Sequence, residues 1–324
     1  MRAVRIHELT GPQALRVDEV ATPDVRAGQI LIDVRACGVN FPDILLTRGQ
    51  YQFKPTPPFS PGGEVAGVVR AIGDGVTTVK VGDRVASTML YGGFAEQVVV
   101  PELAVVKLPD GVSFEVGAAT LLTYATTIHA LVDRAALHKG ETLLVLGAAG
   151  GVGIAAVELG ALLGARVIAA ASSADKLAFC REHGATDTID YSKEDLKDRI
   201  KALTGGNGVD VVYDPVGGPL TEAAVRGTGW QGRYLVIGFA SGEIPKLPLN
   251  LVLLKGCQIV GVFWGSFAMR EPARNRAHAE QIFAWVADRK LNPAVDAALG
   301  FADASEALLR LERRQVKGKL VLVP

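Results

Sequence analysis

The stretch LLVLGAAGGVGIAA, residues 143–156, joins an apolar run to a glycine-rich turn and a second apolar run. A strand that ends at Leu146 and a helix that begins near Gly151 would enclose that turn. Glycines let the backbone approach a pyrophosphate, and the free N–H groups of a helix N-terminus attract its charge. The stretch therefore predicts a dinucleotide site, although the first glycine of the usual fingerprint is an alanine here and a turn that serves only packing is the alternative. The predicted contacts are Ala149, Gly150, Gly151 and Val152.

The sequence around this turn alternates strand-like and helix-like segments. Six runs are rich in β-branched residues without alternating polarity, which is typical of strands buried on both faces of a parallel sheet. We therefore expect an α/β fold with a doubly wound, six-stranded parallel sheet. The six runs are TLLVLG, RVIAAA, TDTID, VDVVYD, RYLVIG and QIVGVF, which together span residues 142–263.

The first 110 residues have a different character, because short β-rich runs alternate there with glycine, proline and aspartate turn signals. They predict a mostly β domain. A helix should follow, with Ser113 as its N-cap. After Phe263 we expect two helical segments and a last strand, KLVLVP.

Composition limits the partners. The 324 residues include 34 Lys plus Arg and 34 Asp plus Glu, so the formal net charge is zero. The chain therefore has no excess positive charge that would attract nucleic acid or an anionic membrane. The N-terminal residues lack the apolar core of a signal peptide, which predicts a cytoplasmic protein. Cys37, Cys180 and Cys257 are far apart in sequence, so we expect buried, unpaired thiols rather than disulfides or a cysteine-rich zinc site.

The end of the strand RVIAAA indicates which dinucleotide binds. NAD-binding folds commonly place a carboxylate there to hold the ribose hydroxyls. This strand ends at Ala171, and Ser172, Ser173 and Lys176 follow, which suits the 2′-phosphate of NADPH. Two charge-assisted bonds of about 1.5–3 kcal/mol each would give a preference for NADPH of roughly 100-fold or more. A solvated lysine on a helix face is the alternative for Lys176.

These residues, together with GVNFPDILLTRGQY, PGGEVAGVV, GDRV, GGFAEQVVV and GKLVLVP, resemble the medium-chain dehydrogenase/reductase superfamily over the full length. The chain is most similar to the zinc-free quinone oxidoreductase, or ζ-crystallin-like, branch. The resemblance implies a GroES-like catalytic domain, residues 1–125 and 264–324, and a Rossmann domain, residues 126–263, with a cleft between them where NADPH meets its acceptor.

The resemblance also indicates that no zinc is bound. Asn40 and Gly63 stand at the positions where zinc-dependent relatives carry a cysteine and a histidine ligand. Glu64 is thereby left without partners that could complete a three-ligand site, and it is expected to be a structural hydrogen-bonding group. The four-cysteine lobe of those relatives is absent as well.

The acceptor site is expected in the matched stretch NFPDILLTRGQY. Asn40, Tyr51 and Arg48 are the candidate contacts, with Asp43 as a support or proton relay. A loop-stabilising role is the alternative for each of them, and it is as plausible as direct contact for Arg48 and Asp43.

Further cofactor contacts follow from the resemblance alone. Thr126 matches a threonine beside the nicotinamide, and Tyr191 matches an aromatic residue near the adenosine phosphate, where Arg314 would supply a cation. The residues expected to line the nicotinamide side are Gly238, Phe239 and the backbone from Phe263 to Gly265. A homodimer is expected through the edge strand QIVGVF, residues 258–263.

Without a Lewis acid, alcohol oxidation is disfavoured, whereas a quinone or conjugated enone can delocalise the incoming hydride charge. The leading prediction is an NADPH-dependent reductase of quinones or related conjugated carbonyls. Two alternatives are an enoyl-thioester reductase and a crystallin-like protein that binds NADPH with little turnover.

Overall fold

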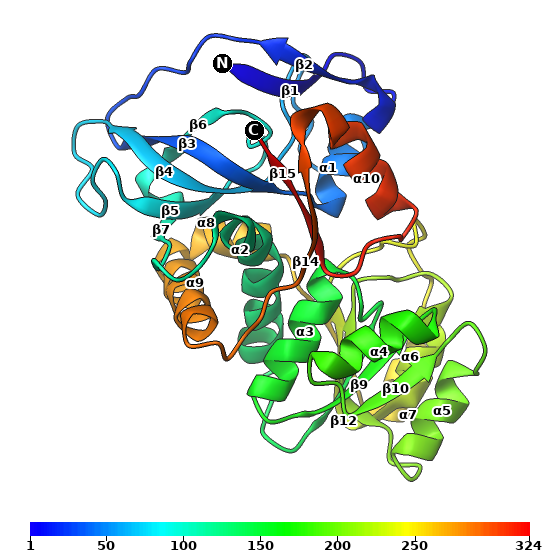
Figure 1. The fold of residues 1–324 in the computed structure, drawn as a ribbon. Helices are drawn as coiled ribbons and strands as arrows, with labels where there is room; N and C mark the ends of the chain where they lie inside the picture. Colours follow the sequence, from blue (N-terminus) through cyan, green and yellow to red (C-terminus); the bar gives the residue numbers. More distant parts are fainter. The chain divides into compact units, whose positions relative to one another are not determined.

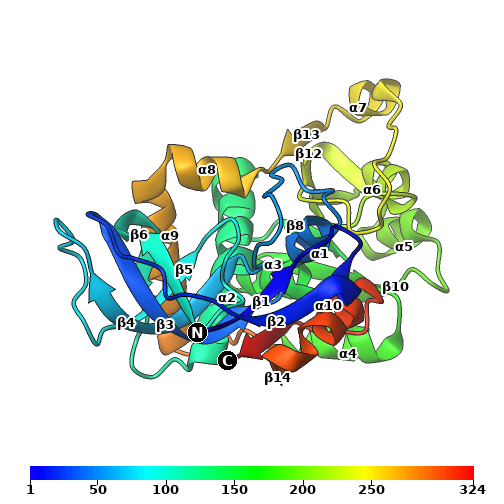
Figure 2. The same ribbon diagram turned by 90° about the horizontal axis from the view of Figure 1, so that it is seen from above.

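The computed structural model describes all 324 residues, which divide into two compact units (Figures 1 and 2). Unit 1 comprises Met1–Leu122, Ala268–Arg289 and Pro293–Pro324, and unit 2 comprises Thr123–Phe267 and Lys290–Asn292. The domain boundaries expected after residues 125 and 263 stay a prediction.

Unit 2 is built on a six-stranded parallel sheet in the order β10-β9-β8-β11-β12-β13. This confirms the predicted α/β fold, and all six predicted runs contain a strand. The strands are β8 (Thr142–Leu146), β9 (Arg166–Ala171), β10 (Asp187–Asp190), β11 (Val209–Asp214), β12 (Thr228–Val236) and β13 (Gln258–Gly261). The strand β12 begins five residues earlier than its predicted run, and β13 ends two residues earlier.

Helices cover both faces of this sheet. The helices α3 (Gly151–Leu162) and α4 (Ala174–Glu182) pack on β8, β9 and β10 (Figure 1). The helices α5 (Leu196–Leu203) and α6 (Leu220–Gly227) pack against each other. Because crossovers between parallel strands are right-handed, the reversal of strand order after β10 puts α5 and α6 on the opposite face from α3 and α4. The buried residues of the sheet therefore contact helices on both sides, as their unbroken apolar runs predicted.

The strand order reverses between β8 and β11, so their carboxyl ends are neighbours at the switch point where doubly wound sheets bind ligands. The turn after β8 begins at Gly147, and the turn after β11 begins at Asp214. The two turns are in close proximity, since a Cβ added at Gly147 would lie 2.8 Å from a methyl group of Val216.

The rest of unit 2 consists of helical segments before and after the sheet. Its boundary with unit 1 falls inside α2 (Phe114–Ile128), which continues as a π-helical turn, η3 (His129–Arg134). Ser113 caps α2 as expected, because its Oγ accepts the backbone N–H of Val116 at 3.2 Å. The helix α7 (Leu249–Lys255) packs on β12 next to the edge strand β13 (Figure 2), and α8 (Trp264–Arg270) follows β13.

Unit 1 is mostly β, as expected. Its main sheet has the order β14-β15-β3-β4-β5-β7, with β6 paired to β3, and β1 pairs with β2 in a separate ribbon. The strands are β1 (Arg2–Ile6), β2 (Leu15–Glu19), β3 (Gln29–Gly38), β4 (Glu64–Ile72), β5 (Arg84–Thr88), β6 (Gln97–Pro101), β7 (Val105–Lys107), β14 (Val295–Gly300) and β15 (Lys319–Val323). The helices are α1 (Phe41–Thr47), α9 (Pro272–Ala287) and α10 (Ala304–Glu312), with the short η1 (Pro12–Ala14), η2 (Glu102–Ala104) and η4 (Phe301–Asp303). The strand β14 was not predicted.

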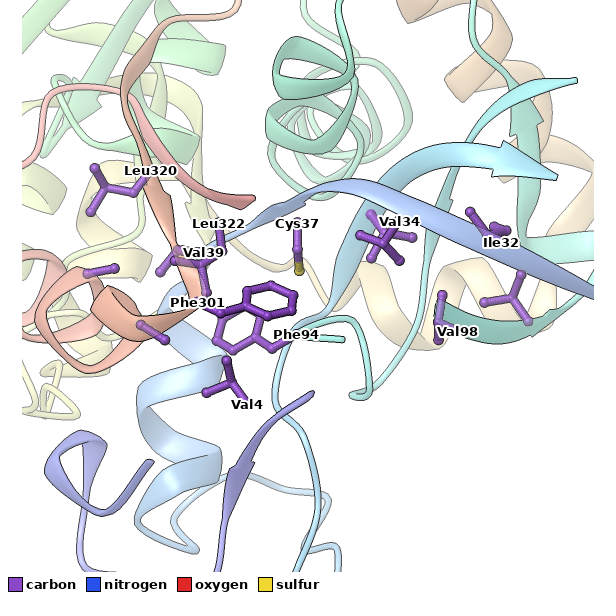
Figure 3. Close-up of a cluster of buried hydrophobic side chains, with 14 of the residues drawn as sticks. Val4, Ile32, Val34, Cys37, Val39, Phe94, Val98, Phe301, Leu320 and Leu322 are labelled. Atoms are coloured by element: carbon purple, nitrogen blue, oxygen red, sulfur yellow. The ribbon is translucent and has the colours of Figure 1, made fainter. Parts of the chain in front are cut away.

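The core of unit 1 joins the two ends of the chain. Phe94 packs with Val4 near the N-terminus and with Phe301 and Leu322 near the C-terminus (Figure 3). Cys37 lies among these apolar side chains with its Sγ 3.0 Å from the carbonyl oxygen of Glu64. All three cysteines are buried and unpaired, which confirms the expectation from their spacing. No helix of the protein combines the length and hydrophobicity needed to cross a bilayer.

Candidate active site

A buried lysine is the centre of the polar cluster that contains the predicted site residue Asn40. Lys319, the first residue of β15, donates from Nζ to Oδ1 of Asn40 at 2.5 Å and to Oε1 of Glu64 at 2.7 Å. It also donates to the carbonyl oxygen of Val39 at 2.9 Å. Its ammonium therefore has three oxygen partners, which fully satisfies its three donors.

Glu64, the first residue of β4, is completely buried and has four hydrogen bonds. Its Oε1 accepts hydrogen bonds from Lys319 and from Nδ2 of Asn40, the latter at 2.9 Å. Its Oε2 accepts the backbone N–H of Leu122 at 2.9 Å, and its backbone carbonyl accepts the thiol of Cys37. Gly38 leaves room for this carboxylate, because a Cβ there would lie 2.3 Å from Oε1. Glu64 has the structural hydrogen-bonding role that the sequence predicted.

Asp43 fixes the start of α1. The helix begins after its N-cap Asn40, and Asp43 Oδ2 accepts the backbone N–H of that residue at 2.8 Å, while Oδ1 accepts the N–H of Gly62 at 2.9 Å. The pKa of Asp43 is raised to about 7, mainly by burial and to a lesser extent by the negative charge of Glu64, while the two backbone N–H groups and Lys319 oppose the rise. These hydrogen bonds tie Asp43 to the start of α1 and to the loop at Gly62, and a part in proton relay stays a prediction.

The geometry favours a structural role for Asn40 over the expected contact with the acceptor. Its amide nitrogen donates to Gly38 and Glu64, and its amide oxygen accepts from Lys319, so both donors are used inside the fold. The side chain is 5% exposed. Asn40 consequently presents no free donor to an acceptor molecule. The sequence missed this because Lys319 is distant in the chain.

Tyr51 differs from Asn40 because its hydroxyl has no hydrogen-bond partner in the protein. Its ring is partly buried against Ile6, Leu46 and Phe59. Burial, and then the charge of Asp43, raises the pKa of Tyr51, so the phenol stays protonated at neutral pH. Tyr51 therefore offers a hydroxyl donor that the fold does not use.

Arg48 is placed in the fold by an ion pair. Its Nη1 lies 2.5 Å from Oε1 of Glu312, and this contact links the end of α1 to the end of α10 (Figure 1). About a third of each side chain is exposed. This ion pair fits the loop-stabilising alternative for Arg48, and direct contact with an acceptor stays a prediction.

The turn after β8 has the geometry that a phosphate group requires. Gly150 is the N-cap of α3, and the first N–H that joins the helix ladder is that of Ile154, which bonds the carbonyl of Gly150 at 2.8 Å. The N–H groups of residues 151–153 are therefore free at the positive end of a 12-residue helix. Gly153 is required for packing, because a Cβ there would lie 2.3 Å from the carbonyl oxygen of Gly147.

The end of β9 also fits a phosphate. Ser172 is exposed, and Ser173 caps α4, its Oγ accepting the backbone N–H of Lys176 at 3.4 Å. The Ser173 hydroxyl can still donate its proton. Ala171 is 2% exposed, so the residue that faces outward at this strand end is Ser172. A second helix N-terminus and two hydroxyls thus lie where the sequence predicted the 2′-phosphate contacts.

The remaining predicted cofactor residues lie on several elements. Most belong to unit 2: Thr126 is in α2, Tyr191 follows β10, Gly238 and Phe239 follow β12, and Phe263 and Gly265 are at the start of α8. Phe239 and Phe263 are 36% and 60% exposed. Arg314 belongs to unit 1, just after α10, with a φ of 59°. Their contacts with a cofactor stay predictions.

Two site residues were not found from the sequence. Asp214 ends β11 at the switch point, where it accepts the N–H groups of Val216 and Gly217 at 2.7 and 2.9 Å and so shapes the turn beside Gly147. The sequence signal for Asp214 is an acidic residue at the end of an apolar strand, followed shortly by two glycines. For Lys319, the signal was a lone cation at the start of the apolar run KLVLVP.

The donor set around Lys319 does not suit a metal ion. An ammonium and a carboxamide accompany the one carboxylate, and Gly63 offers no side chain. No group of three His, Cys, Asp or Glu side chains in the protein could hold a metal. That the protein is free of zinc stays a prediction.

Comparisons with known proteins match both units. Residues 26–110 match the alcohol dehydrogenase GroES-like domain, and residues 151–280 match the zinc-binding dehydrogenase family. The quinone oxidoreductase-like protein 2 homolog of Nematostella vectensis is 39% identical over 99% of this chain and 88% of its own length. The quinone oxidoreductase of Pseudomonas aeruginosa is 35% identical over 97% of each chain. The crystal structure of Escherichia coli quinone oxidoreductase complexed with NADPH superimposes with a TM-score of 0.93 at 28% identity, covering 100% of both chains.

Proposed function

The chain belongs to the zinc-free quinone oxidoreductase branch of the medium-chain dehydrogenase/reductase superfamily, and from this we propose that it is an NADPH-dependent reductase of quinones or related conjugated carbonyls. The observation that carries the proposal is the contact of Lys319 with Asn40 and Glu64. The buried ammonium of Lys319 is hydrogen-bonded to the side-chain oxygens of Asn40 and Glu64, so these oxygens are not available as metal ligands. The acceptor must therefore be one that takes a hydride without a Lewis acid, which a conjugated carbonyl can do.

The cofactor assignment rests on residues of unit 2. The free N–H groups of residues 151–153 suit the pyrophosphate, and Ser172, Ser173 and Lys176 suit a 2′-phosphate. The relative from E. coli carries NADPH in its crystal structure. Bound NADPH would supply the hydride of the reaction.

Unit 1 would supply the donor that meets the developing negative charge. The Tyr51 hydroxyl is protonated, partly buried and not used by the fold, so it can donate to an acceptor oxygen. Asp43 and Asn40 act as positioning residues, since they hold the start of α1 and the loop at Gly62. The overall reaction consumes one NADPH, one proton and one quinone and yields NADP⁺ and the hydroquinone.

The test is steady-state kinetics that follow NADPH absorbance with 1,4-benzoquinone and with a crotonyl thioester. Loss of a donor worth about 2–4 kcal/mol in Tyr51→Phe should slow quinone turnover by roughly 30- to 1000-fold, with NADPH affinity unchanged. Arg226→Met, which breaks an exposed ion pair with Glu222 on α6, is the control and should retain turnover.

Two results would move the function elsewhere. Thioester turnover far above that of every quinone would indicate enoyl reduction, and NADPH binding without turnover of either acceptor would indicate a binding protein.

We also propose a homodimer formed through β13. This strand pairs only with β12, and it leaves an open edge on the sheet of unit 2. Apolar side chains near this edge are exposed, among them Ile259 at 40% and Leu253 at 79%. Leu253 belongs to α7, which lies near β13 (Figure 2). Burial of this edge by a second copy would join two sheets into one. The cytoplasmic location expected from the sequence stays a prediction.

A further inference from the structure

An aromatic patch in unit 1 is not explained by the packing of the fold. We define it by Tyr51, Phe53, Phe59 and Tyr91. The rings of Phe53 and Tyr91 are stacked, with centroids 5.8 Å apart and planes at 23°, and Phe59 meets Tyr91 edge to face at 5.7 Å. The rings of Phe53, Tyr91 and Phe59 are thus continuous from one loop to the next, and Tyr51 packs on the same small cluster as Phe59.

The outer part of this patch is exposed. Phe59 is only 6% exposed, but Phe53 is 43% exposed and Tyr91 is 39% exposed. The stacked pair therefore presents aromatic surface that a third flat ring could cover. The hydroxyls of Tyr51 and Tyr91 have no partner in the protein, so the patch also offers two hydrogen-bond donors.

The two loops that carry the patch are held in place before any ligand binds. Phe59 exchanges backbone hydrogen bonds with Ile6 at 2.8 and 3.3 Å. The loop of Tyr91 is tied to the other loop by the N–H of Gly92, which bonds the carbonyl of Ser60 at 2.8 Å. Prolines at positions 55, 57, 58 and 61 restrict the first loop further. A preformed surface loses little conformational entropy when it binds a ligand.

Charge indicates which ligand fits. Residues 49–62 contain one charged side chain, Lys54, and residues 86–95 contain none. A phosphorylated carrier such as coenzyme A would need a basic surface, which these loops do not provide. A neutral, flat ring with carbonyl oxygens matches both the rings and the free hydroxyls.

We propose that the aromatic patch is the binding site for the ring system of the acceptor and that it selects fused-ring quinones over small non-aromatic enones. This inference rests on the proposed function, and it assigns the acceptor class to Phe53 and Tyr91 in addition to Tyr51. Offset stacking of one more ring on Phe53 and Tyr91 supplies the selectivity.

The experiment compares the unmodified chain with Phe53→Leu and Tyr91→Leu. In each variant the KM for 1,4-naphthoquinone should rise about threefold to tenfold, while kcat/KM for 2-cyclohexen-1-one and the affinity for NADPH stay the same. Leu103→Ala is the matched control, because Leu103 is a 67% exposed apolar residue of unit 1 in η2 and should change none of these values.

A redox-inert probe separates this inference from the proposed function. Binding of 2-naphthol, followed by its fluorescence, should weaken by a similar factor in both variants and not in the control. Quinone turnover with unchanged KM and unchanged 2-naphthol affinity in both variants would overturn the inference and leave the function standing. If no acceptor is reduced but 2-naphthol binds, and both variants lower its affinity, the aromatic patch binds flat rings and the proposed function is wrong. A change of molecular mass in Phe53→Leu or Tyr91→Leu would show that the patch contacts a second copy, and it would also overturn the inference.

Discussion

The ammonium of Lys319 lies 2.7 Å from the carboxylate of Glu64, and both side chains are nearly inaccessible to water. The two residues belong to β15 and β4, which flank β3 in the sheet of unit 1. Removing either charge leaves the other one buried without compensation, which is more costly than removing both.

Lys319→Met should therefore lower the free energy of unfolding by about 3–5 kcal/mol. Adding Glu64→Gln should restore part of the loss, because the double variant no longer holds an unpaired charge. Urea denaturation of the four chains of this cycle gives the coupling energy, expected on the order of 1–3 kcal/mol. Arg226→Met, which breaks an exposed ion pair with Glu222, should cost no more than about 0.5 kcal/mol. Additive effects in the cycle would contradict the prediction.

Asp43 should lower the free energy of unfolding as pH rises, whereas an acid in a salt bridge raises it. Its pKa is about 7 in the folded chain and 3.8 in the reference state, so the folded chain binds more protons between these values. Stability therefore falls as pH rises from about 4 to 7, and the cost is complete above pH 7. A shift of this size corresponds to about 4 kcal/mol.

The measurement is the free energy of unfolding of the unmodified chain minus that of Asp43→Asn at several pH values from 4 to 8. This difference should fall by the stated amount as pH rises. Asp74→Asn, in an exposed turn, is the control and should give a flat difference. Parallel profiles for Asp43→Asn and the unmodified chain would show that folding does not shift the pKa of Asp43.

Zinc should be absent from the purified protein. The Lys319 ammonium and the Asn40 carboxamide hold the Glu64 carboxylate, which leaves no three-ligand set. Elemental analysis should find no stoichiometric zinc, and activity should persist in a chelator. One zinc per chain that is lost together with activity would refute this prediction.

Cofactor preference should respond to Ser172. An aspartate at this exposed strand end would repel a 2′-phosphate and hold the ribose hydroxyls of NADH. We expect Ser172→Asp to reduce kcat/KM for NADPH by about tenfold or more and to raise it for NADH. The NADH value of the same variant is the internal control, because a misfolded chain would lose both. Equal use of both cofactors by the unmodified chain would contradict the NADPH assignment.

The dimer should depend on the edge of the unit 2 sheet. Ile259→Lys places a charge on β13, which should prevent strand pairing between copies and give a monomer mass by light scattering. Leu103→Lys introduces the same charge on unit 1 and should leave the mass unchanged. A monomer mass for the unmodified chain at micromolar concentration would exclude the dimer.

The fold was largely predictable because its signals are local. Runs of β-branched residues such as VDVVYD mark strands buried on both faces, and the turn at residues 147–150 marks the strand-to-helix junction. The strand β14 was missed because its sequence, VDAALG, has few β-branched residues and depends on pairing with β15. Its formation depends on tertiary contacts rather than on local propensity.

The candidate site was less predictable because its contacts are not local. Lys319 reaches Glu64 across 255 residues of sequence, and no periodicity reports such a contact. That one lysine changes Asn40 from an expected acceptor contact into part of the fold. Arg48 was likewise ambiguous until its partner Glu312 was known. Tyr51 remained a good candidate because no such partner exists for its hydroxyl.

The position of β15 in the sheet imposes an order on biosynthesis. The strands of unit 2 lie within residues 142–261, so its sheet can form before β15 has been translated. Unit 1 contains the first residues of the chain, but its main sheet is completed later than the sheet of unit 2. The strand β3 can pair with β15, and Glu64 can bind its counter-ion Lys319, only when Lys319–Val323 has been translated. A nascent chain stalled shortly before that point could have a folded nucleotide-binding unit, while its β-rich unit would still lack the cation that neutralises Glu64.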